Sequence, residues 1–328
     1  MDRKRGKVLV ITNKDDAHAD AVISRASQLG YGENTVRLNT EDFLHNCAVC
    51  FDDMDYHVTI RDSKREFWSS ELLSVWYRRP KTITVTDTED TGVQTFIEKQ
   101  ANAAMRGLFF LSHETAKWVN PLPALHQARL KLPQLKLASQ VGFNVPATLV
   151  TNEPARVKAF FEKNPCACVC NKSLDEPNFV IGNQIHTYLT KRFASYEEIL
   201  PDVDSVCICP TMFQAYIDKA LDIRVVIMGD RITAVQIESQ SKSLSEVDFR
   251  GVSPHLLSHR VHKLPDEIIQ SIREFMAKSR LIFSSMDLVM DKEGKYFFIE
   301  NNCNGQWLWL DGLANTTLVD DMVHLLYE

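Results

Sequence analysis

The sequence predicts an α/β protein in which an open α/β domain is followed by two subdomains that mix helices with strands. Three observations support this fold class. The chain opens with a β-α-β pattern, formed by Val8–Thr12, a helical stripe through Ala19 and Ala26, and Val36–Leu38. The middle third alternates short extended segments with helices, and the last third contains two pairs of apolar strands joined by turns.

The bulk composition is that of an ordinary globular protein. The chain has 328 residues, 45% of them hydrophobic, which is enough for two or three domains. Its net charge of -6 argues against general binding to nucleic acids or membranes, although a local basic pocket is compatible with it. No apolar run approaches the ~20 residues of a membrane span. The apolar run Val8–Ile11 is too short for a secretory signal. We therefore expect a cytoplasmic protein with neither nucleic acid nor a membrane as its partner.

The cysteines favour a reduced core over a metal site. One CxxC pair and two alternating sets are present: Cys47 and Cys50, then Cys166, Cys168 and Cys170, then Cys207 and Cys209. Alternation places each set on one face of a strand. A zinc site requires two well-spaced pairs or nearby histidines, and the nearest histidine, His186, lies in another segment. Small buried thiols are the preferred interpretation, with zinc as the alternative.

The predicted N-terminal domain covers residues 1–120. Its first helix, with a stripe formed by Ala19, Val22, Ala26 and Leu29, ends at Gly30. Short strands at His57–Arg61 and Val75–Tyr77 follow, and a long helix through Ile97, Ala101, Ala104, Met105 and Leu108 closes the domain. No GxGxxG motif is present, so nothing here indicates a dinucleotide. The segment Asn120–Pro123 is typical of a connector.

The predicted central subdomain covers residues 121–210. A helix through Leu132, Leu135 and Ala138 ends at Gly142. Val145–Val150 contains Pro146 and is therefore expected to be an edge strand. Thr151 or Asn152 is expected to cap the next helix, with Pro154 in its first turn. Cys166–Asn171 is a further strand.

The predicted C-terminal subdomain covers residues 211–328 and contains two hairpins. Ile223–Met228 and Arg231–Ile237 flank Gly229-Asp230, which is a hairpin signal. A helix begins at Pro265, where acidic residues in the first turn suit the helix dipole. The second hairpin joins Met286–Met290 to Lys295–Glu300 through the turn Asp291–Gly294.

The second hairpin contains the strongest chemical signal, because two carboxylates interrupt apolar strands. If Met290 pairs with Lys295, Asp287 lies opposite Phe298 with Glu300 as its diagonal neighbour. A two-residue turn at Glu293-Gly294 places Asp287 directly opposite Glu300 instead. Either even-length turn brings the two carboxylates together, whereas a one-residue bulge is expected to separate them. Asn302 continues the alternation, and such oxygen ligands suit Mg²⁺. The alternative is a set of polar residues facing solvent.

These motifs resemble those of ATP-grasp ligases, and more narrowly the microviridin-type, or graspetide, peptide-maturing branch. The C-terminal signature comprises Asp287-Leu288, Phe298-Ile299-Glu300-Asn301-Asn302 and Gly305-Gln306-Trp307-Leu308-Trp309. Further matches, in the order expected for the branch, are Val75–Pro80, Lys131–Leu135 with Ala138 and Gly142, Pro146–Thr148 with Thr151 and Asn152, Gln214–Ile217, Asp222–Val225 and Asp248–Arg250. The resemblance spans about Val75 to Trp309. Single motifs are weak, and their order together with the GQWLW segment is specific.

The resemblance implies an ATP-grasp fold with ATP and Mg²⁺ bound between the central and C-terminal subdomains. The implied metal ligands are Asp287, Glu300 and Asn302. The implied ATP-binding residues are Lys131, Lys172, Gln214, Ala215, Tyr216, Ile217, Asp222 and Arg224. The two lysines match those that bind the phosphates, Gln214–Ile217 the adenine hinge, Asp222 the ribose acid and Arg224 the γ-phosphate arginine. From the sequence alone, a solvated surface charge is the favoured interpretation of each lysine, and the alternative for Asp222 is an N-terminal strand cap.

One departure from the wider superfamily concerns the glycine-rich loop that covers the phosphates in many ATP-grasp enzymes. The segment Ser173–Thr190 contains only Gly182. The peptide-maturing branch often lacks that loop, so its absence favours this branch over the D-alanine ligase type.

The implied reaction activates an Asp or Glu side chain of a peptide as an acylphosphate, with release of ADP. A Ser or Thr hydroxyl then forms an ester, or a Lys amine an amide. The catalytic candidates are Arg224 and Arg250, and the substrate anchors are Arg78, Arg79 and Arg250, because guanidinium pairs bidentately with carboxylate. Consecutive strand residues point opposite ways, so only one of Arg78 and Arg79 is expected to face the pocket. The cluster His255, His259 and His262 is either a proton-transfer group or ordinary surface.

The implied partners are a ribosomal precursor peptide, with a leader and a core rich in acidic and hydroxyl residues, and a second copy of the chain in a homodimer. One alternative is an amino-acid ligase of the glutamate-ligase type. Another is an ATP-binding regulator without catalysis, which is expected to have lost metal ligands that this sequence retains. Ring size, ring number and the choice between ester and amide are not encoded in these motifs.

Overall fold

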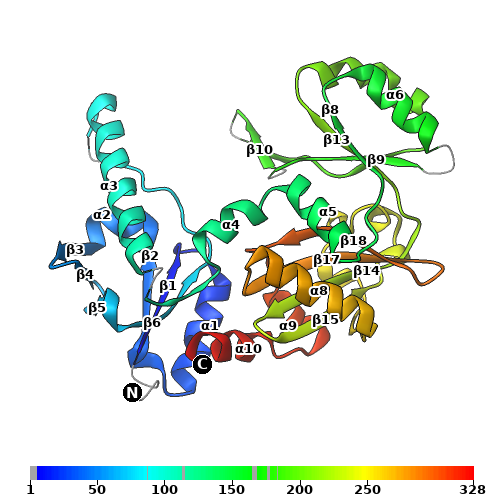
Figure 1. Ribbon diagram of the computed structural model, residues 1–328. Coiled ribbons are helices and arrows are strands. Elements are labelled where there is room, and N and C mark those ends of the chain that lie inside the picture. Colours follow the sequence, from blue (N-terminus) through cyan, green and yellow to red (C-terminus); the bar gives the residue numbers. More distant parts are fainter. Residues whose placement is uncertain (1–5, 87, 113–114, 165–167, 176–177, 183) are drawn as a thin grey trace.

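The computed structural model describes residues 6–86, 88–112, 115–164, 168–175, 178–182 and 184–328. Within these residues, three larger sheets are formed in turn by the first, middle and last parts of the chain (Figure 1). Two small antiparallel sheets accompany them. No helix of this described part is long and apolar enough to cross a membrane.

The N-terminal sheet is parallel and has the strand order β2-β1-β6-β7. Its strands are β1 (Lys7–Thr12), β2 (Thr35–Asn39), β6 (Leu72–Tyr77) and β7 (Lys117–Val119). Val8 to Ile11 are at most 1% exposed, since a parallel sheet is covered on both faces. The predicted β-α-β opening is confirmed, and β7 was missed.

Helix α1 (Ala17–Gln28) connects β1 to β2. It begins at Asp16, whose side chain accepts a hydrogen bond from the His18 amide. The chain leaves the helix through Gly30, which has a φ of 88°. Leu29 was predicted to belong to the buried stripe and is 44% exposed, because it is the C-cap residue.

A small antiparallel sheet and a long helix complete this part of the molecule. The sheet has the order β3-β4-β5, and its elements are β3 (Cys47–Asp52), β4 (Asp55–Ile60) and β5 (Arg65–Trp68). The helices are α2 (Phe43–Asn46) and α3 (Thr91–Ser112). The predicted strand at His57–Arg61 corresponds to β4, and the predicted long helix to α3.

Two short helices lead out of this region. Helix α4 (Leu122–Ala128) starts inside the predicted connector, so that prediction is wrong in its second half. Proline is tolerated in a first helical turn, where its missing N–H group needs no partner. Helix α5 (Lys131–Gln140) follows and ends before Gly142, as predicted.

The central sheet is antiparallel with the order β12-β9-β13-β8. Its strands are β8 (Thr148–Thr151), β9 (Val169–Lys172), β12 (Lys191–Phe193) and β13 (Thr211–Ala215), and a separate hairpin joins β10 (Asn178–Ile181) to β11 (Gln184–Thr187). The helices are α6 (Pro154–Lys163) and α7 (Tyr196–Ile199). The edge position predicted for the strand after Gly142 is confirmed, because β8 pairs only with β13 among the described strands.

Two details of the central prediction are wrong. Helix α6 is preceded by Glu153 rather than capped by Thr151 or Asn152, and the Thr151 hydroxyl accepts from the Glu153 amide instead. The cysteine-rich strand begins at Val169, later than predicted. Its expected first residue, Cys166, lies outside the described residues.

The C-terminal sheet is antiparallel with the order β16-β15-β14-β17-β18. Its strands are β14 (Lys219–Met228), β15 (Arg231–Ile237), β16 (His259–Val261), β17 (Phe283–Asp291) and β18 (Tyr296–Asn302). The helices are α8 (Asp266–Ser279), α9 (Leu308–Ala314) and α10 (Leu318–Tyr327). Both predicted hairpins are confirmed as elements.

The two faces of the C-terminal sheet belong to different cores. Val225 and Ile227 of β14 pack in one cluster with α4, α5 and α8. Val226 and Met228 point the other way and pack with α10 and with Val8 of the N-terminal sheet. This sheet is therefore the layer to which both the connector helices and the N-terminal domain attach. The predicted boundaries at residues 120 and 210 stay a prediction.

A buried histidine joins the N-terminal domain to helix α9. The backbone N–H groups of Trp307 and Leu308 both donate to Nε2 of His18, over 2.9 and 3.0 Å. The Trp307 ring packs edge-on against the imidazole, with centroids 5.0 Å apart. Since Nε2 accepts two hydrogen bonds, the imidazole must be neutral. Burial, reinforced by the nearby positive charge of Arg78, lowers the pKa of His18 to about 4.

This histidine makes the stability of the protein sensitive to acid. The unfolded imidazole titrates near its ordinary pKa of 6.5 and the folded one near 4, so the stabilisation is complete above about pH 6.5 and is lost as the pH falls towards 4. We expect the free energy of unfolding of the parent protein to fall by on the order of 3 kcal/mol over this range. His18→Gln keeps a hydrogen-bond acceptor but does not titrate, so it should abolish this fall. Urea unfolding at a series of pH values measures it, and parallel profiles for the two proteins contradict the prediction.

Candidate functional site

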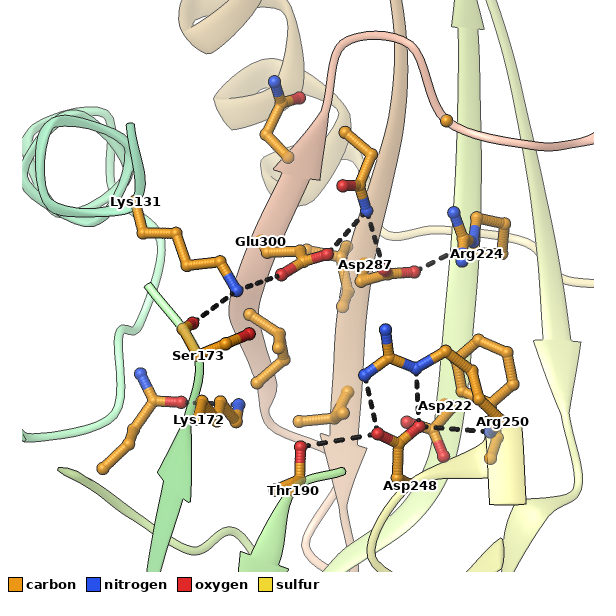
Figure 2. A pocket seen from close by; sticks show the side chains of 18 of the residues that line it. Lys131, Lys172, Ser173, Thr190, Asp222, Arg224, Asp248, Arg250, Asp287 and Glu300 are labelled. Carbon is orange, nitrogen blue, oxygen red and sulfur yellow. Dashed lines mark hydrogen bonds and ion pairs between the residues drawn. The ribbon is translucent and has the colours of Figure 1, made fainter. Parts of the chain in front are cut away.

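The residues that the sequence singled out converge on one cavity of about 840 Å³. Its lining comes from the segment after the N-terminal strand β6, from the central and C-terminal sheets and from α5. Figure 2 shows Lys131 of α5 beside the strands that contain Asp287 and Glu300. All the predicted ATP-binding and metal residues line it, and of the predicted substrate anchors only Arg78 does not. The lining members are Arg79, Lys131, Lys172, Gln214, Ala215, Tyr216, Ile217, Asp222, Arg224, Arg250, Asp287, Glu300 and Asn302.

Asp287 and Glu300 are direct cross-strand partners, but not for the predicted reason. Met290 pairs with Tyr296 rather than with Lys295, so the expected register is wrong by one residue. That odd-numbered register alone would place the two carboxylates on opposite faces of the sheet. A bulge between Asp287 and Leu288 shifts the pairing once more and restores the match. The bulge that was expected to separate the carboxylates therefore brings them together.

Asn302 joins the carboxylates on the same face of the sheet. Its amide nitrogen donates to Oδ2 of Asp287 over 3.2 Å and to Oε1 of Glu300 over 2.8 Å. Rotation of the amide would present its oxygen instead, giving two carboxylates and one carbonyl oxygen, a donor set suited to Mg²⁺. Within the described part of the chain, no cluster of three or more His, Cys, Asp or Glu residues could hold a metal, so the amide is needed to complete this set.

Each carboxylate has its own cation (Figure 2). Lys131 of α5 lies 3.1 Å from Glu300, and the Arg224 guanidinium of β14 lies 2.9 Å from Asp287. Burial raises the pKa of Asp287 to about 6, with Arg224 opposing and Glu300 adding to the rise. Burial also acts to raise the pKa of Glu300, but Lys131 and Asn302 outweigh it and hold that pKa at about 2.

The second predicted phosphate-binding lysine lies on the central sheet. Lys172 ends β9 and donates to Oε1 of Gln214 over 2.8 Å, while the Gln214 amide donates to the Thr148 hydroxyl. Gln214 is 1% exposed, so its side chain is fixed. Lys131 donates to the backbone oxygen of Ser173, which connects α5 to the segment after β9.

Asp222 lines the cavity, but both of its carboxylate oxygens are engaged. The Lys219 ammonium donates to them over 2.9 and 2.7 Å. It also donates to the backbone oxygen of Val247, so the pair holds down the loop between β15 and β16. The sequence prediction missed Lys219, because a lysine at the start of a strand has no distinctive pattern.

Arg250 lies on that same loop and is paired with a neighbour in sequence. Its Nε and Nη2 groups donate to the two carboxylate oxygens of Asp248 over 2.8 and 2.6 Å. The Arg250 guanidinium keeps the pKa of Asp248 low against the opposing effect of burial. The Thr190 hydroxyl reaches Asp248 from the central subdomain over 3.4 Å (Figure 2). The loop therefore bridges two subdomains at the cavity.

The expectation that Arg78 anchors substrate is corrected. Its side chain is fully buried, and its Nη1 donates to the backbone oxygens of Asn304 and Gly305 over 2.5 and 3.3 Å. Its Nε lies 3.7 Å from Asp16. Arg79 is exposed and lines the cavity. Arg78 thus connects the loop after β18 to the N-terminal domain, whereas Arg79 faces the cavity.

The histidine cluster lies outside the cavity. Both ring nitrogens of His262 are within hydrogen-bond distance of other side chains, Gln236 and Tyr296. His259 packs against Trp309, with ring centroids 5.2 Å apart. Neither these two nor His255 is among the described residues that line the cavity. The geometry therefore favours the interpretation that these three histidines are ordinary residues and not proton-transfer groups.

Comparison with known proteins assigns the architecture. Residues 7–126 match the family model of the MvdD pre-ATP-grasp domain. Comparison with the curated proteins gives no match. The resemblance predicted from the motifs is thus confirmed for the N-terminal domain.

Solved structures extend the match over the whole chain. The macrocyclase MdnC from Microcystis aeruginosa MRC, bound with precursor peptide MdnA, has 23% identity and a TM-score of 0.82, covering 98% of this chain and 99% of that one. A RiPP-associated ATP-grasp ligase from Chryseobacterium gregarium, in complex with ADP and a leader and core peptide, has 24% identity and a TM-score of 0.86, covering 98% and 96%.

The third comparison is more distant. The ATP-grasp ligase PsnB, complexed with a phosphomimetic variant of minimal precursor, Mg and ADP, has 17% identity and a TM-score of 0.74, covering 98% of this chain and 97% of that one. At these identities the comparisons establish the fold, and the predicted ATP-grasp fold is confirmed.

The ion pairs of the cavity predict an unusual effect on metal binding. Lys131 occupies Glu300, so a divalent cation must displace it, and we expect Lys131→Met to tighten the binding of Mn²⁺ to the nucleotide-free protein about tenfold. Electron paramagnetic resonance of free Mn²⁺ measures the affinity. Lys136→Met, an exposed change on the same helix, is the control and should leave it unaltered. Weaker binding to Lys131→Met contradicts the prediction.

Proposed function

We propose that this chain, which has the ATP-grasp fold and an MvdD-type pre-ATP-grasp domain, is an ATP-dependent peptide ligase. In this proposal it converts Asp or Glu side chains of a ribosomal precursor peptide into acylphosphates, with release of ADP. It then joins each acyl group to a Ser or Thr hydroxyl as an ester, or to a Lys amine as an amide. When both groups belong to one peptide, the product is a macrocycle.

The observation that carries the proposal is the arrangement of charges around Asp287 and Glu300. Two carboxylates face each other inside a cavity and are each paired with a cation from another element, α5 or β14. A site of this kind can accept a divalent cation on its acids while the displaced cations turn to an anionic ligand. Phosphoryl transfer needs such positioning and charge neutralisation more than covalent help.

The donor set fits Mg²⁺, which would be held by Asp287, Glu300 and Asn302. When bound, the ion neutralises charge on the phosphates. The Arg224 Nε has no hydrogen-bond partner of acceptable geometry among the described residues, although it lies against Asp287. A divalent cation on Asp287 would release the Arg224 guanidinium to a phosphate oxygen, in the predicted catalytic role of Arg224.

ATP is proposed to lie between the central and C-terminal subdomains. The N–H groups of Ala215 and Tyr216 already donate to the backbone oxygens of Ala147 and Cys168, so the backbone of Ile217 is the part of the hinge that we propose for the adenine edge. Among the described residues, Lys172 has the neutral Gln214 as its hydrogen-bond partner and no carboxylate, so it is well placed for a phosphate. The ribose role of Asp222 requires at least one of its oxygens to leave Lys219.

Arg250 is proposed to hold the reacting carboxylate, since its loop reaches the same cavity as Asp287. To do so, the Arg250 guanidinium must release the Asp248 carboxylate and bind the substrate carboxylate, which is a partner of the same chemical type. The carboxylate oxygen attacks the γ-phosphorus, the bond to ADP breaks, and the hydroxyl or amine then expels phosphate. No nucleophilic side chain of the protein is needed for these steps.

We propose a precursor peptide as the partner of this chain, by analogy with its structural relatives. The relatives MdnC and the Chryseobacterium ligase are complexed with precursor or leader and core peptides. We extend this partner class to the present chain, together with a leader bound away from the active site, as the family resemblance implies, the homodimer and the cytoplasmic location.

Mass spectrometry tests the reaction directly. Incubation of the precursor peptide encoded beside the gene with protein, ATP and Mg²⁺ should remove about 18 Da, one water, for each bond formed. Mild base should reverse esters and leave amides intact. An unchanged mass, with ADP released only when a free amino acid is added, supports the amino-acid ligase instead.

A substitution in the acidic pair tests the site. Glu300→Gln keeps the side-chain shape but removes one of the two charges that face the proposed ion, so we expect kcat/KM to fall at least about 100-fold. Steady-state ADP release measures it. Glu293→Gln, an exposed change in the turn of the same hairpin, is the matched control. Equal activity of the two variants would remove the acidic pair from the mechanism.

A further inference from the structure

The charges that line the cavity are not balanced. Its described lining contains seven Lys and Arg residues and five Asp and Glu residues, an excess of two cations in a chain of net charge -6. Four of the cations each have a carboxylate partner: Lys131 with Glu300, Lys219 with Asp222, Arg224 with Asp287, and Arg250 with Asp248. The remaining three are Lys172, Arg79 and Arg129.

Lys172 lies at the central-subdomain end of the cavity, whereas the two arginines lie at the other end. Arg79 is the second residue after β6, at the carboxyl edge of the N-terminal parallel sheet, where ligands of open α/β sheets bind. Arg129 ends α4, two residues before Lys131. In Figure 1, β6 and β13 lie on either side of α4 and α5. The two arginines thus belong to segments beside the N-terminal sheet and α4, whereas the proposed adenine hinge follows β13 of the central sheet.

Neither arginine is neutralised by a carboxylate of the described residues. They are exposed, and neither has a described carboxylate within ion-pair distance. The backbone of Arg79 is held by the Asn13 amide, which donates to its carbonyl oxygen over 2.6 Å. Arg129 lies near the Cys303 thiol, whose pKa burial raises and the guanidinium lowers. Arg129 is therefore directed at the loop after β18.

That loop contributes a further donor. The amide nitrogen of Asn304 is buried and has no hydrogen-bond partner among the described residues, although the residue lines the cavity. Its position is fixed, because the buried Arg78 donates to its carbonyl oxygen. An unpaired buried donor in the wall of a cavity that also contains two guanidinium groups is a group that lacks its acceptor.

We propose that Arg79, Arg129 and Asn304 form a second carboxylate-binding subsite, which holds an acidic side chain of the peptide other than the one being activated. Guanidinium groups match carboxylates bidentately, and no ATP phosphate is needed at this end of the cavity. The inference rests on the proposed function. It adds that two carboxylates of the substrate are recognised. The reacting one lies at Arg250, near Asp287 and Glu300, and the other lies at this subsite.

Peptide binding without turnover tests the subsite. The probe is a fluorescein-labelled, C-amidated peptide of alternating Thr and Glu residues, and its affinity is measured by anisotropy with ADP and Mg²⁺ present. We expect Arg79→Gln and Arg129→Gln each to weaken it about tenfold, and Arg129→Lys less, because a lysine keeps the charge but loses the fork. The affinity for a fluorescent ADP analogue should not change.

Two controls isolate the carboxylate. Arg106→Gln removes an equal charge from an exposed residue of α3 that does not line the cavity, and it should bind the probe as the parent does. A peptide of alternating Thr and Gln should bind weakly to the parent and show no further loss with Arg129→Gln.

Three results overturn the inference. They are equal binding of the Glu and Gln peptides to the parent, equal effects of Arg129→Gln and Arg106→Gln, and arginine dependence that appears only when the Gln peptide carries a free C-terminal carboxylate. Failure of the proposed reaction is a separate outcome. It would leave arginine-dependent binding of the Glu peptide intact, with no condensed product.

Discussion

The juxtaposition of Asp287 and Glu300 is the constraint on which the site depends. Two carboxylates held side by side in a partly buried place repel one another unless positive charge is supplied. The chain supplies it from two separate elements, through Lys131 of α5 and Arg224 of β14. Through these contacts, Lys131 joins α5 to β18 and Arg224 joins β14 to β17. The same cations are then available for anionic ligands when another cation takes the acids.

A second constraint is the attachment of the loop after β18 to the N-terminal domain. Arg78 binds the carbonyl groups of this loop, His18 accepts from the start of α9, and Asn120 donates to the carbonyl oxygens of Phe283 and Cys303. Gly305 is needed there, because a Cβ atom would lie 2.5 Å from the side chain of Ser285. The N-terminal domain is therefore part of the cavity wall, and this explains how Arg79 comes to line the cavity.

The sequence predicted the elements better than their registration. Period-two strands and the Gly229-Asp230 turn determined both C-terminal hairpins, since apolar alternation and turn chemistry are local. The pairing of Asp287 with Glu300 depended on an odd register corrected by a bulge, and no local pattern encodes a bulge. The burial of Arg78 and the exposure of Arg79 were equally hidden, because alternation says that the two point apart but not which one meets the protein. No sequence pattern indicated a role for Asn304.

The charge distribution connects these features. Every carboxylate proposed to act on a ligand is already satisfied by a cation, so the four ion pairs of the cavity add little net field. The excess charge is concentrated on Arg79, Arg129 and Lys172, which come from three different segments. A ligand anionic at both ends, with a phosphate chain at one and an acidic peptide at the other, balances this excess. A neutral peptide does not, and the net charge of -6 makes the rest of the chain on average less favourable to an acidic peptide than this cavity. The proposed preference for acidic peptides therefore follows from the arrangement of charges in the cavity, before any reaction begins.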